Sequence, residues 1–321
     1  MIIVKTPFRI SFFGGSTDYE SFYKKHGSFI IATTINKYIW MTARTRPKIL
    51  PRQHTIAYSK LETVSTIDQI ENPLIRETMR YCNIDSYIDF NSSADILSRT
   101  GLGGSSSFCV GMVHLIKSIQ GKKTTKKDMA KSAIYIERKI LKDSGGIQDQ
   151  ILASYGGFNT IEIDKKGNFE VKPLPVSDKF KKELQNSIVL IYTNSQRDQN
   201  EISKSHENKD KKKILELARK AEKYFLKENI QAIGKLLFRA WKEKRKISPL
   251  ISTPKIDATV EKVMKLGAYG VKLLGSGGCG FLMVICNPTT KKKIFKEFRD
   301  NIMEIEFEDQ GTSIVYPNNL Q

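Results

Sequence analysis

One stretch limits what this chain can fold into more than any other: Arg99-Thr-Gly-Leu-Gly-Gly-Ser-Ser-Ser-Phe108. Three glycines within four residues precede three serines, and the apolar residues that follow recur at three- and four-residue steps, which predicts an amphipathic helix. Free backbone N–H groups and the helix dipole therefore converge just after the glycines and favour an anion. The serine hydroxyls could bind a phosphate or a Mg²⁺ ion. A Gly/Ser turn with a serine N-cap explains the same residues, so both interpretations stay open.

The composition is that of an ordinary soluble protein. Of the 321 residues, 40% are hydrophobic and 27% are charged, and no apolar run is long enough to span a membrane. The N-terminus does not resemble a secretion signal, and the four cysteines have no paired or metal-ligand spacing, so we expect a cytoplasmic protein. The net charge of +19 comes from lysines spread along the chain, which favours a solvated surface over nucleic-acid binding.

The apolar patterns predict a mixed order of strands and helices. In the first half, we expect strands at 2–13, 29–32, 38–43 and 87–90, a polar loop at 44–60, and helices at 66–82, after Ser107 and from Thr125 to Leu141. In the second half, we expect strands at 188–192, 281–286 and near the end, and helices at 199–228, 229–247, 253–265 and after Pro288. The lysine- and proline-rich stretch 165–186 marks the expected domain boundary, which we place between residues 178 and 179.

Two acidic residues stand out. Glu137 falls on or beside the apolar face of the predicted helix, where a carboxylate is costly unless a metal ion, a lysine or an arginine pairs with it. Asp149 lies between two glycine pairs, which predicts a tight turn rather than a helix flank. Such an Asp could point into a cleft or serve only the turn. A second glycine loop, Val271 to Gly280, makes it less credible that both loops are accidental turns.

Four features in a fixed order now resemble the GHMP family of small-molecule kinases, which includes galactokinases, homoserine kinases, mevalonate kinases and phosphomevalonate kinases. They are Pro7 to Asp18, Gly101 to Ser107, Asp149, and Gly275 to Gly280, so the resemblance covers nearly the whole chain. The stretch from Asp149 to Asn159 and the segment Trp241-Lys-Glu-Lys-Arg245 look most like the branch of heptose 7-phosphate kinases and fucokinase-type enzymes. The chain departs from the family by lacking a proline shortly before the first glycine loop.

This resemblance implies a two-domain α+β fold. Residues 1–178 would form a ribosomal-S5-like α/β domain that binds ATP and sugar, and residues 179–321 would form a ferredoxin-like C-terminal domain. The function implied is Mg²⁺- and ATP-dependent phosphorylation of the anomeric hydroxyl of heptose 7-phosphate by a monomer or homodimer. The alternatives are a free-sugar kinase acting on L-fucose or galactose, a non-catalytic sugar- or nucleotide-binding regulator, and an S5-like RNA-binding protein.

The resemblance also implies roles for individual residues. Those expected around the ATP phosphates are Arg99, Gly101, Leu102, Gly103, Gly104, Ser105, Ser106 and Ser107. Glu137 would hold Mg²⁺ together with Ser105, or with Ser106 if the alignment slips by one. Asp149 would be the catalytic base, with Arg9 beside it. The residues expected at the sugar are Ser16, Thr17, Asp18, Gly275, Gly277 and Gly278, with Arg197 on its phosphate. Lys244 and Arg245 are weaker phosphate candidates, and surface charge explains them more simply.

Overall fold

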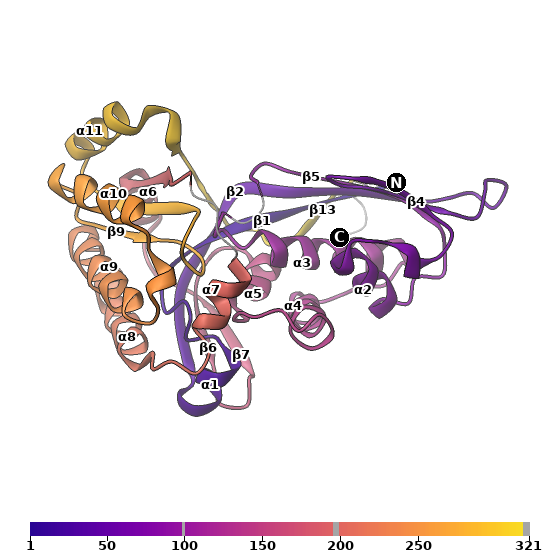
Figure 1. Cartoon of the computed structure of the whole chain (residues 1–321), viewed down its shortest axis with the longest axis horizontal. Helices are drawn as coiled ribbons and strands as arrows, with labels where there is room; N and C mark the ends of the chain where they lie inside the picture. The colour runs from indigo at the N-terminus through magenta and orange to yellow at the C-terminus, as the bar shows by residue number, and fades with distance from the viewer. Residues whose placement is uncertain (98–99, 195–198, 317–321) are drawn as a thin grey trace.

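The computed structural model describes residues 1–97, 100–194 and 199–316, which form two β-sheets with helices packed on them (Figure 1). The strands of the first sheet are β1 (Ile2–Phe13), β2 (Ser28–Thr45), β3 (His54–Ala57), β4 (Leu61–Val64), β5 (Ile88–Ala94), β6 (Phe158–Ile163), β7 (Phe169–Pro173), β12 (Phe307–Glu308) and β13 (Ser313–Tyr316). The strands of the second sheet are β8 (Ile188–Tyr192), β9 (Gly270–Leu273), β10 (Phe281–Ile285) and β11 (Ile302–Met303). This is the expected α+β fold.

The predicted helices are present with corrected ends. In the first half they are α1 (Glu20–His26), η1 (Ile67–Gln69), α2 (Pro73–Tyr81), α3 (Gly104–Ile119), α4 (Lys126–Tyr135), η2 (Ile136–Ile140) and α5 (Gln148–Tyr155). In the second half they are α6 (Asp178–Ser187), α7 (Gln199–Ser205), α8 (Lys212–Leu226), α9 (Ile230–Arg245), η3 (Pro249–Ile251), α10 (Pro254–Lys265), α11 (Pro288–Phe298) and η4 (Arg299–Asn301). Helices α1, α5 and α6 were not predicted. The predicted helix after Ser107 is confirmed, and it begins at Gly104, four residues before Phe108.

Strand β2 is the central element of the first sheet. The sheet runs in the order β13-β1-β2-β5-β3-β4, while β6 and β12 also pair with β2. The prediction of two strands separated by a break is wrong, because β12 pairs with Thr34 and Ile35 and keeps the polar stretch inside the sheet. The register against β1 shifts between Pro7 and Phe8 and absorbs the extra residues there. The predicted loop at 44–60 is also wrong in part, because it contains β3.

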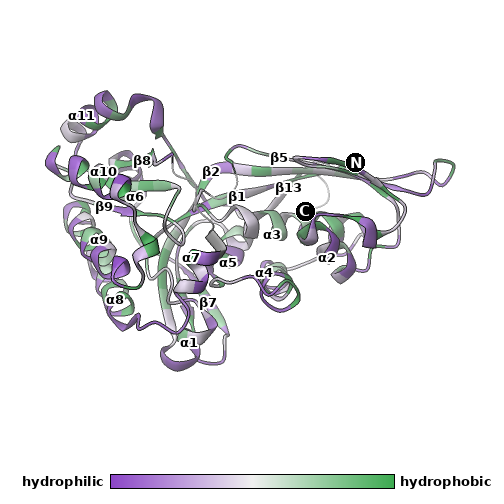
Figure 2. Cartoon of the chain, viewed as in Figure 1, coloured by the Kyte–Doolittle hydropathy of each residue, from purple (hydrophilic) through white to green (hydrophobic). Residues whose placement is uncertain are grey.

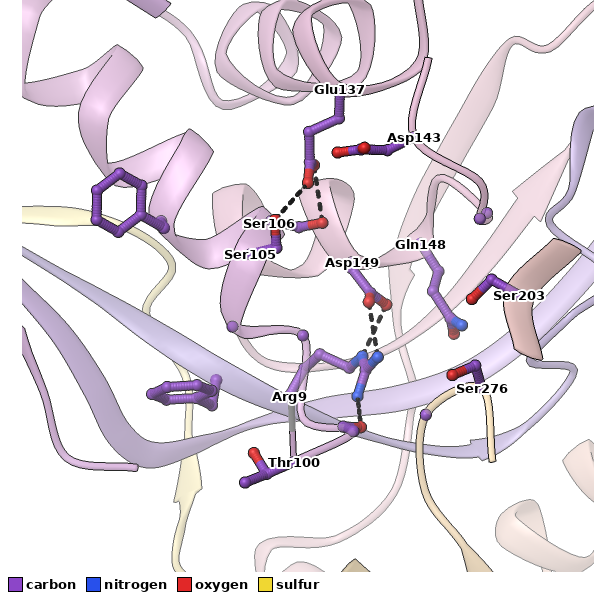
Figure 3. A pocket seen from close by; sticks show the side chains of 18 of the residues that line it. Arg9, Thr100, Ser105, Ser106, Glu137, Asp143, Gln148, Asp149, Ser203 and Ser276 are labelled. Carbon is purple, nitrogen blue, oxygen red and sulfur yellow. Dashed lines mark hydrogen bonds and ion pairs between the residues drawn. The ribbon is translucent and has the colours of Figure 1, made fainter. Parts of the chain in front are cut away.

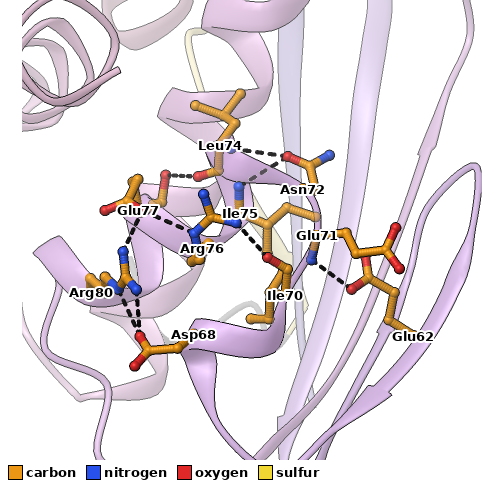
Figure 4. A network of polar contacts seen from close by, with 11 residues as sticks. Glu62, Asp68, Ile70, Glu71, Asn72, Leu74, Ile75, Arg76, Glu77 and Arg80 are labelled. Carbon is orange, nitrogen blue, oxygen red and sulfur yellow. Dashed lines mark hydrogen bonds and ion pairs between the residues drawn. The ribbon is translucent and has the colours of Figure 1, made fainter. Parts of the chain in front are cut away.

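The predicted helix at 66–82 starts later than the apolar pattern indicated. Asn72 caps α2, since its side-chain oxygen accepts from the N–H groups of Leu74 (3.0 Å) and Ile75 (3.2 Å), and Pro73 occupies the first helical position (Figure 4). Arg76 returns from the helix and donates to the carbonyl of Ile70 (2.7 Å). The cap at Asn72 and the proline at the first position fix the start of α2, and the earlier part of the predicted helix forms the separate short helix η1.

The predicted helix from Thr125 to Leu141 changes form before it ends. Thr125 caps α4 as expected, by accepting from the N–H of Asp128 (3.1 Å). From Ile136 the α-helix gives way to one turn of π-helix, η2, in which Glu137 is buried. A π turn inserts an extra residue and rotates the side chains that follow, and such turns are common at functional sites.

The two halves of the chain share apolar contacts. Helix α3 packs against β1 and β2, and α8 from the second half also contacts both strands. Phe225 of α8 lies in one aromatic cluster with Phe12 of β1 (5.6 Å between ring centroids) and Phe158 of β6 (5.5 Å). Figure 2 shows hydrophilic residues on the outer sides of α8 and α9. The short strands β12 and β13 return from the end of the chain to the first sheet, and the placement of the domain boundary stays a prediction.

The two glycine loops meet backbone to backbone. A Cβ added to Gly275 would lie 2.5 Å from the Cα of Gly101, and one added to Gly280 would lie 2.1 Å from the carbonyl oxygen of Thr100. The N–H of Phe281 also donates to that carbonyl (3.3 Å). Only glycine permits so close an approach of two chains. The second glycine loop therefore supports the first.

We expect Gly280→Ala to lower the free energy of unfolding by about 3 kcal/mol, because a rigid backbone carbonyl blocks the added methyl group and the φ of +104° is strained for alanine. Urea denaturation measures the loss. Gly121→Ala is the matched control: its φ of +67° also favours glycine, but a Cβ there meets nothing within 4 Å, so only the smaller conformational cost applies. Equal losses in both variants would contradict the contact between the loops.

Candidate active site

A cleft of about 840 Å³ lies between the first glycine loop, the start of α5 and the second glycine loop. Both halves of the chain line it, with β1 and α3 on one side and Lys244, Lys272 and Ser276 on the other. Figure 3 shows Glu137, Asp149 and Arg9 one after another along the cleft, with Ser105 and Ser106 facing Glu137. The motifs that the sequence separates by more than a hundred residues are therefore neighbours.

The first glycine loop is fixed to strand β1. Gly103 precedes α3 in the left-handed conformation, with a φ of +81°. The carbonyl of Leu102 accepts from the N–H of Arg9 (3.0 Å), and the hydroxyl of Ser107 donates to the carbonyl of Pro7 (2.8 Å). Gly104 and Ser105 at the start of α3 line the cleft. The unpaired N–H groups of the first turn thus lie where an anion would bind.

Arg9 and Asp149 form a two-point ion pair at the centre of the cleft. The Nε of Arg9 donates to Oδ1 of Asp149 (2.7 Å) and Nη2 donates to Oδ2 (2.6 Å). Its Nη1 donates to the carbonyl of Gly101 (2.6 Å). The arginine side chain is 5% exposed and that of Asp149 is 23% exposed, so the carboxylate is held in place but still reaches the cleft. The expectation of a turn was wrong, because Asp149 lies in the first turn of α5.

Asp18 caps α5 from a distant part of the sequence. No local side chain caps this helix, and Oδ2 of Asp18 accepts from the N–H of Gln148 (3.0 Å) while Oδ1 accepts from the N–H of Ser16 (3.0 Å). Gly146 allows this contact, since a Cβ there would lie 1.8 Å from the carboxylate. Burial raises the pKa of Asp18, and the hydrogen bond from Gln148 opposes that shift. Asp18 therefore orients the helix turn that carries Asp149.

Glu137 is 1% exposed yet lines the cleft. Its oxygens accept from the hydroxyls of Ser105 (3.0 Å) and Ser106 (2.8 Å) and from Nε2 of Gln150 (2.5 Å). Burial raises the pKa of Glu137, and the nearby charge of Arg138 opposes that shift. No ion pair to Glu137 is found among residues 1–97, 100–194 and 199–316, so the salt-bridge interpretation is wrong for those residues. A buried carboxylate with two hydroxyls beside it is a set of hard oxygen ligands that suits Mg²⁺.

Not every residue that the sequence singled out reaches the cleft. Leu102 and Ser107 are buried beside the glycine loop, and Thr17 is enclosed by the carbonyl of Gly14 (2.7 Å) and the hydroxyl of Ser28 (2.6 Å). Gly277 and Gly278 pack against η3 rather than lining the cleft. Those that do line it are Arg9, Ser16, Asp18, Gly101, Gly103, Gly104, Ser105, Ser106, Glu137, Asp149 and Gly275. Arg99 and Arg197 lie outside the described residues.

Lys244 is the main correction to the expected site. The interpretation of Lys244 as surface charge is wrong, since its side chain is buried. The residue is 6% exposed, lines the cleft and donates to the carbonyl of Gly275. Arg245 does lie at the surface, paired with Asp257 (2.6 Å). Lys272 and Ser203 line the cleft as well, although no sequence pattern had singled them out. A signal existed for Lys244, because it follows Trp241 by three positions on the apolar face of α9.

The lining of the cleft also includes the apolar side chains of Ile39, Leu74, Ile96 and Phe108, together with the polar residues Tyr58, Ser59, Asn72, Ser92 and Ser93. An aromatic heterocycle with polar edges suits such a surface.

Within the described residues, no helix combines the length and apolar character needed to cross a bilayer.

Comparisons with known proteins agree with this geometry. A family profile for the N-terminal domain of GHMP kinases matches residues 70–157, and one for their C-terminal domain matches residues 221–302, which together make up just over half of the chain. A D-glycero-alpha-D-manno-heptose 7-phosphate kinase of Campylobacter jejuni is 26% identical over 97% of each chain. A galactokinase of Pyrococcus furiosus is 25% identical over 91% of each chain.

The fold is shared with a solved structure. The crystal structure of a D-glycero-D-manno-heptose 1-phosphate kinase from Bacteroides thetaiotaomicron superposes with a TM-score of 0.81, at 24% identity and over 98% of each chain. At this identity the likeness establishes the fold of both halves of the chain.

The buried charge of Glu137 predicts a pH-dependent difference in stability. Because its pKa is raised in the folded state, the folded protein binds this proton more tightly than the unfolded chain does, and stability falls as the pH rises from the ordinary pKa of 4.5 through the raised one. Glu137→Gln removes the titrating carboxyl group and with it this pH-dependent loss of stability. Without divalent cations, urea denaturation should show the variant gaining stability relative to wild type between pH 5 and pH 8.

The exposed Glu261 of α10 provides the control for this measurement. The difference in unfolding free energy between Glu261→Gln and wild type should be the same at both pH values. A constant difference for Glu137→Gln as well would mean that the Glu137 carboxyl does not titrate as a buried acid.

Proposed function

Because the chain belongs to the GHMP kinase family, we propose that it transfers the γ-phosphoryl group of ATP to the anomeric hydroxyl of a sugar phosphate, with D-glycero-α-D-manno-heptose 7-phosphate as substrate and the 1,7-bisphosphate as product. The observation that carries this proposal is the carboxylate of Asp149, held by Arg9 beside the glycine loop (Figure 3). The relative that covers nearly the whole chain and is named for heptose 7-phosphate supports the choice of sugar.

Asp149 is the proposed general base. The ion pair with Arg9 leaves the carboxylate partly exposed in the cleft, where it can accept the proton of an attacking hydroxyl. Phosphoryl transfer needs alignment and charge stabilisation more than covalent help, and Arg9 and the N–H groups at the start of α3 supply fixed positive charge and dipoles. The sugar hydroxyls would lie near Ser16, Ser203 and the second glycine loop.

ATP would lie along the rest of the cleft. The adenine ring would pack against apolar lining residues such as Phe108 and Leu74, and the phosphates would bind at the glycine loop between Gly101 and Ser106. Mg²⁺ would be held by Glu137 with Ser105 or Ser106, and it would offset charge on the phosphates. The hydrogen bonds that Glu137 accepts from both serines show that these oxygens already converge.

A free-sugar kinase is the second candidate, since the galactokinase similarity extends over most of the chain. Assays that compare phosphorylated and unphosphorylated sugars, and that locate the new phosphate on the product, separate the two. Absence of phosphoryl transfer to any sugar, together with intact nucleotide binding, would favour a non-catalytic regulator.

Asp149→Asn should reduce kcat by about 100-fold or more, because the proton acceptor is lost while the fork of Arg9 keeps an oxygen partner. Steady-state kinetics and ATP-binding calorimetry measure the two effects, and ATP affinity should change little. Asp85→Asn, in an exposed loop, is the control. If turnover of Asp149→Asn stays within about threefold of wild type, Asp149 is not the base.

Glu137→Gln should raise the Mg²⁺ concentration needed for half-maximal activity by about tenfold or more, because a neutral amide oxygen is a weaker ligand for a hard cation. A titration of activity against Mg²⁺ at saturating ATP measures the shift. An unchanged titration would remove Glu137 from the metal site and assign it to the support of Ser105 and Ser106.

A further inference from the structure

Two lysines on the floor of the cleft are buried without an opposite charge in contact. Lys244 of α9 is 6% exposed and Lys272 of β9 is 7% exposed, and both line the cleft. In the part of the chain that the structure describes, neither ammonium group lies within ion-pair distance of a carboxylate. Burying an uncompensated charge is costly, so such groups are retained where an anion binds.

Their protein hydrogen bonds do not use all the donors. An ammonium group has three N–H donors. Lys244 donates to the carbonyl of Gly275, and Lys272 donates to the carbonyls of Ser11 (2.8 Å) and Phe12 (2.9 Å). At least one donor on each lysine therefore remains for a ligand in the cleft.

The electrostatics of this region are also unbalanced. Burial lowers the pKa of Lys244 to about 8, and the positive charge of Arg9 adds to that shift while Asp18 and Asp149 oppose it. Burial, Lys244 and Arg9 together lower the pKa of Lys272 well below its usual value. The two carboxylates whose charge opposes the shift at Lys244 are already engaged, Asp149 by Arg9 and Asp18 by two backbone N–H groups. A ligand with two negative charges would restore the balance.

Lys272 lies beyond the reacting centre along β1, as seen from the proposed ATP site, and Lys244 lines the same cleft. Along β1, Phe8 contacts the glycine loop at Gly104 and Arg9 holds Asp149, whereas Lys272 binds the carbonyls of Ser11 and Phe12. Two to three residues of strand correspond to about 7–10 Å. Strand β1 then leads to the Gly14–Asp18 turn on the proposed sugar side.

We propose that Lys244 and Lys272 bind the phosphate group that the acceptor sugar carries at the end away from the reacting hydroxyl. This inference rests on the proposed kinase function and assigns the substrate to the sugar phosphates. Lysines bind a phosphate as point charges and tolerate several orientations, which suits a group at the end of a flexible carbon chain. The recognition of the phosphate then comes from the second half of the chain, and the catalytic pair comes from the first.

The test is Lys244→Gln, whose amide can still donate to the carbonyl of Gly275 but carries no charge. We expect kcat/KM for heptose 7-phosphate to fall about 10- to 100-fold, and to fall at least 10-fold more than kcat/KM for the same sugar without its phosphate. Lys242→Gln is the matched control, since Lys242 lies on the same helix with its ammonium over the ring of Phe238. Equal losses on both sugars would overturn the proposal and assign Lys244 to the ATP phosphates.

A second measurement does not depend on turnover. With a non-hydrolysable ATP analogue filling the nucleotide site, inorganic phosphate should raise the melting temperature of wild type and of Lys242→Gln above that in chloride of equal ionic strength. The rise should be lost in Lys244→Gln, and a rise that persists there would overturn the subsite. Were the wild type to phosphorylate only unphosphorylated sugars, the proposed substrate would fail, and this phosphate-binding result would still decide the subsite.

Discussion

The guanidinium of Arg9 is the interaction on which the cleft depends. One planar group from β1 holds both oxygens of Asp149 on α5 and the carbonyl of Gly101 in the first glycine loop. Gly103 permits this, because a Cβ there would lie 3.1 Å from the arginine side chain. A lysine could not replace it, since a single ammonium cannot present parallel donors to both carboxylate oxygens. Strand β1, helix α5 and the first glycine loop, which lie far apart in the sequence, are thus fixed relative to one another.

Around this group, the two halves of the chain are held by different means. On the apolar side, Phe225 of α8 packs into the aromatic cluster of β1 and β6, and burial of such rings provides a large non-directional attraction. On the polar side, glycine backbones touch and the ammonium of Lys272 joins the carbonyls of β1. The aromatic packing therefore stabilises the contact between the two halves of the chain, and the glycine and lysine contacts determine its geometry.

The sequence predicted what depends on local pattern. Glycines before an amphipathic pattern predicted α3 and its loop, and the apolar pattern of the next predicted helix, from Thr125 to Leu141, placed Glu137 on or beside the apolar face. It could not predict the cap that Asp18 provides for α5, because the two lie 130 residues apart. The continuity of β2 depended in the same way on pairing with β12, near the other end of the chain. The helical spacing from Trp241 could have placed Lys244 on the buried face of α9, but a lysine in a run of charged residues was interpreted as surface charge.

The pairing of β13 with β1 has a consequence for how the protein is made. Strand β1 has β13 as its outer neighbour in the sheet, with Val4 opposite Ile314, although about 300 residues separate the two strands in the sequence. At about 5–20 residues per second, β1 would wait on the order of tens of seconds for that partner. During this time its hydrogen-bonding edge is open to other chains. We therefore expect chains that stop before residue 313 to need chaperone protection more than chains that include β13 do.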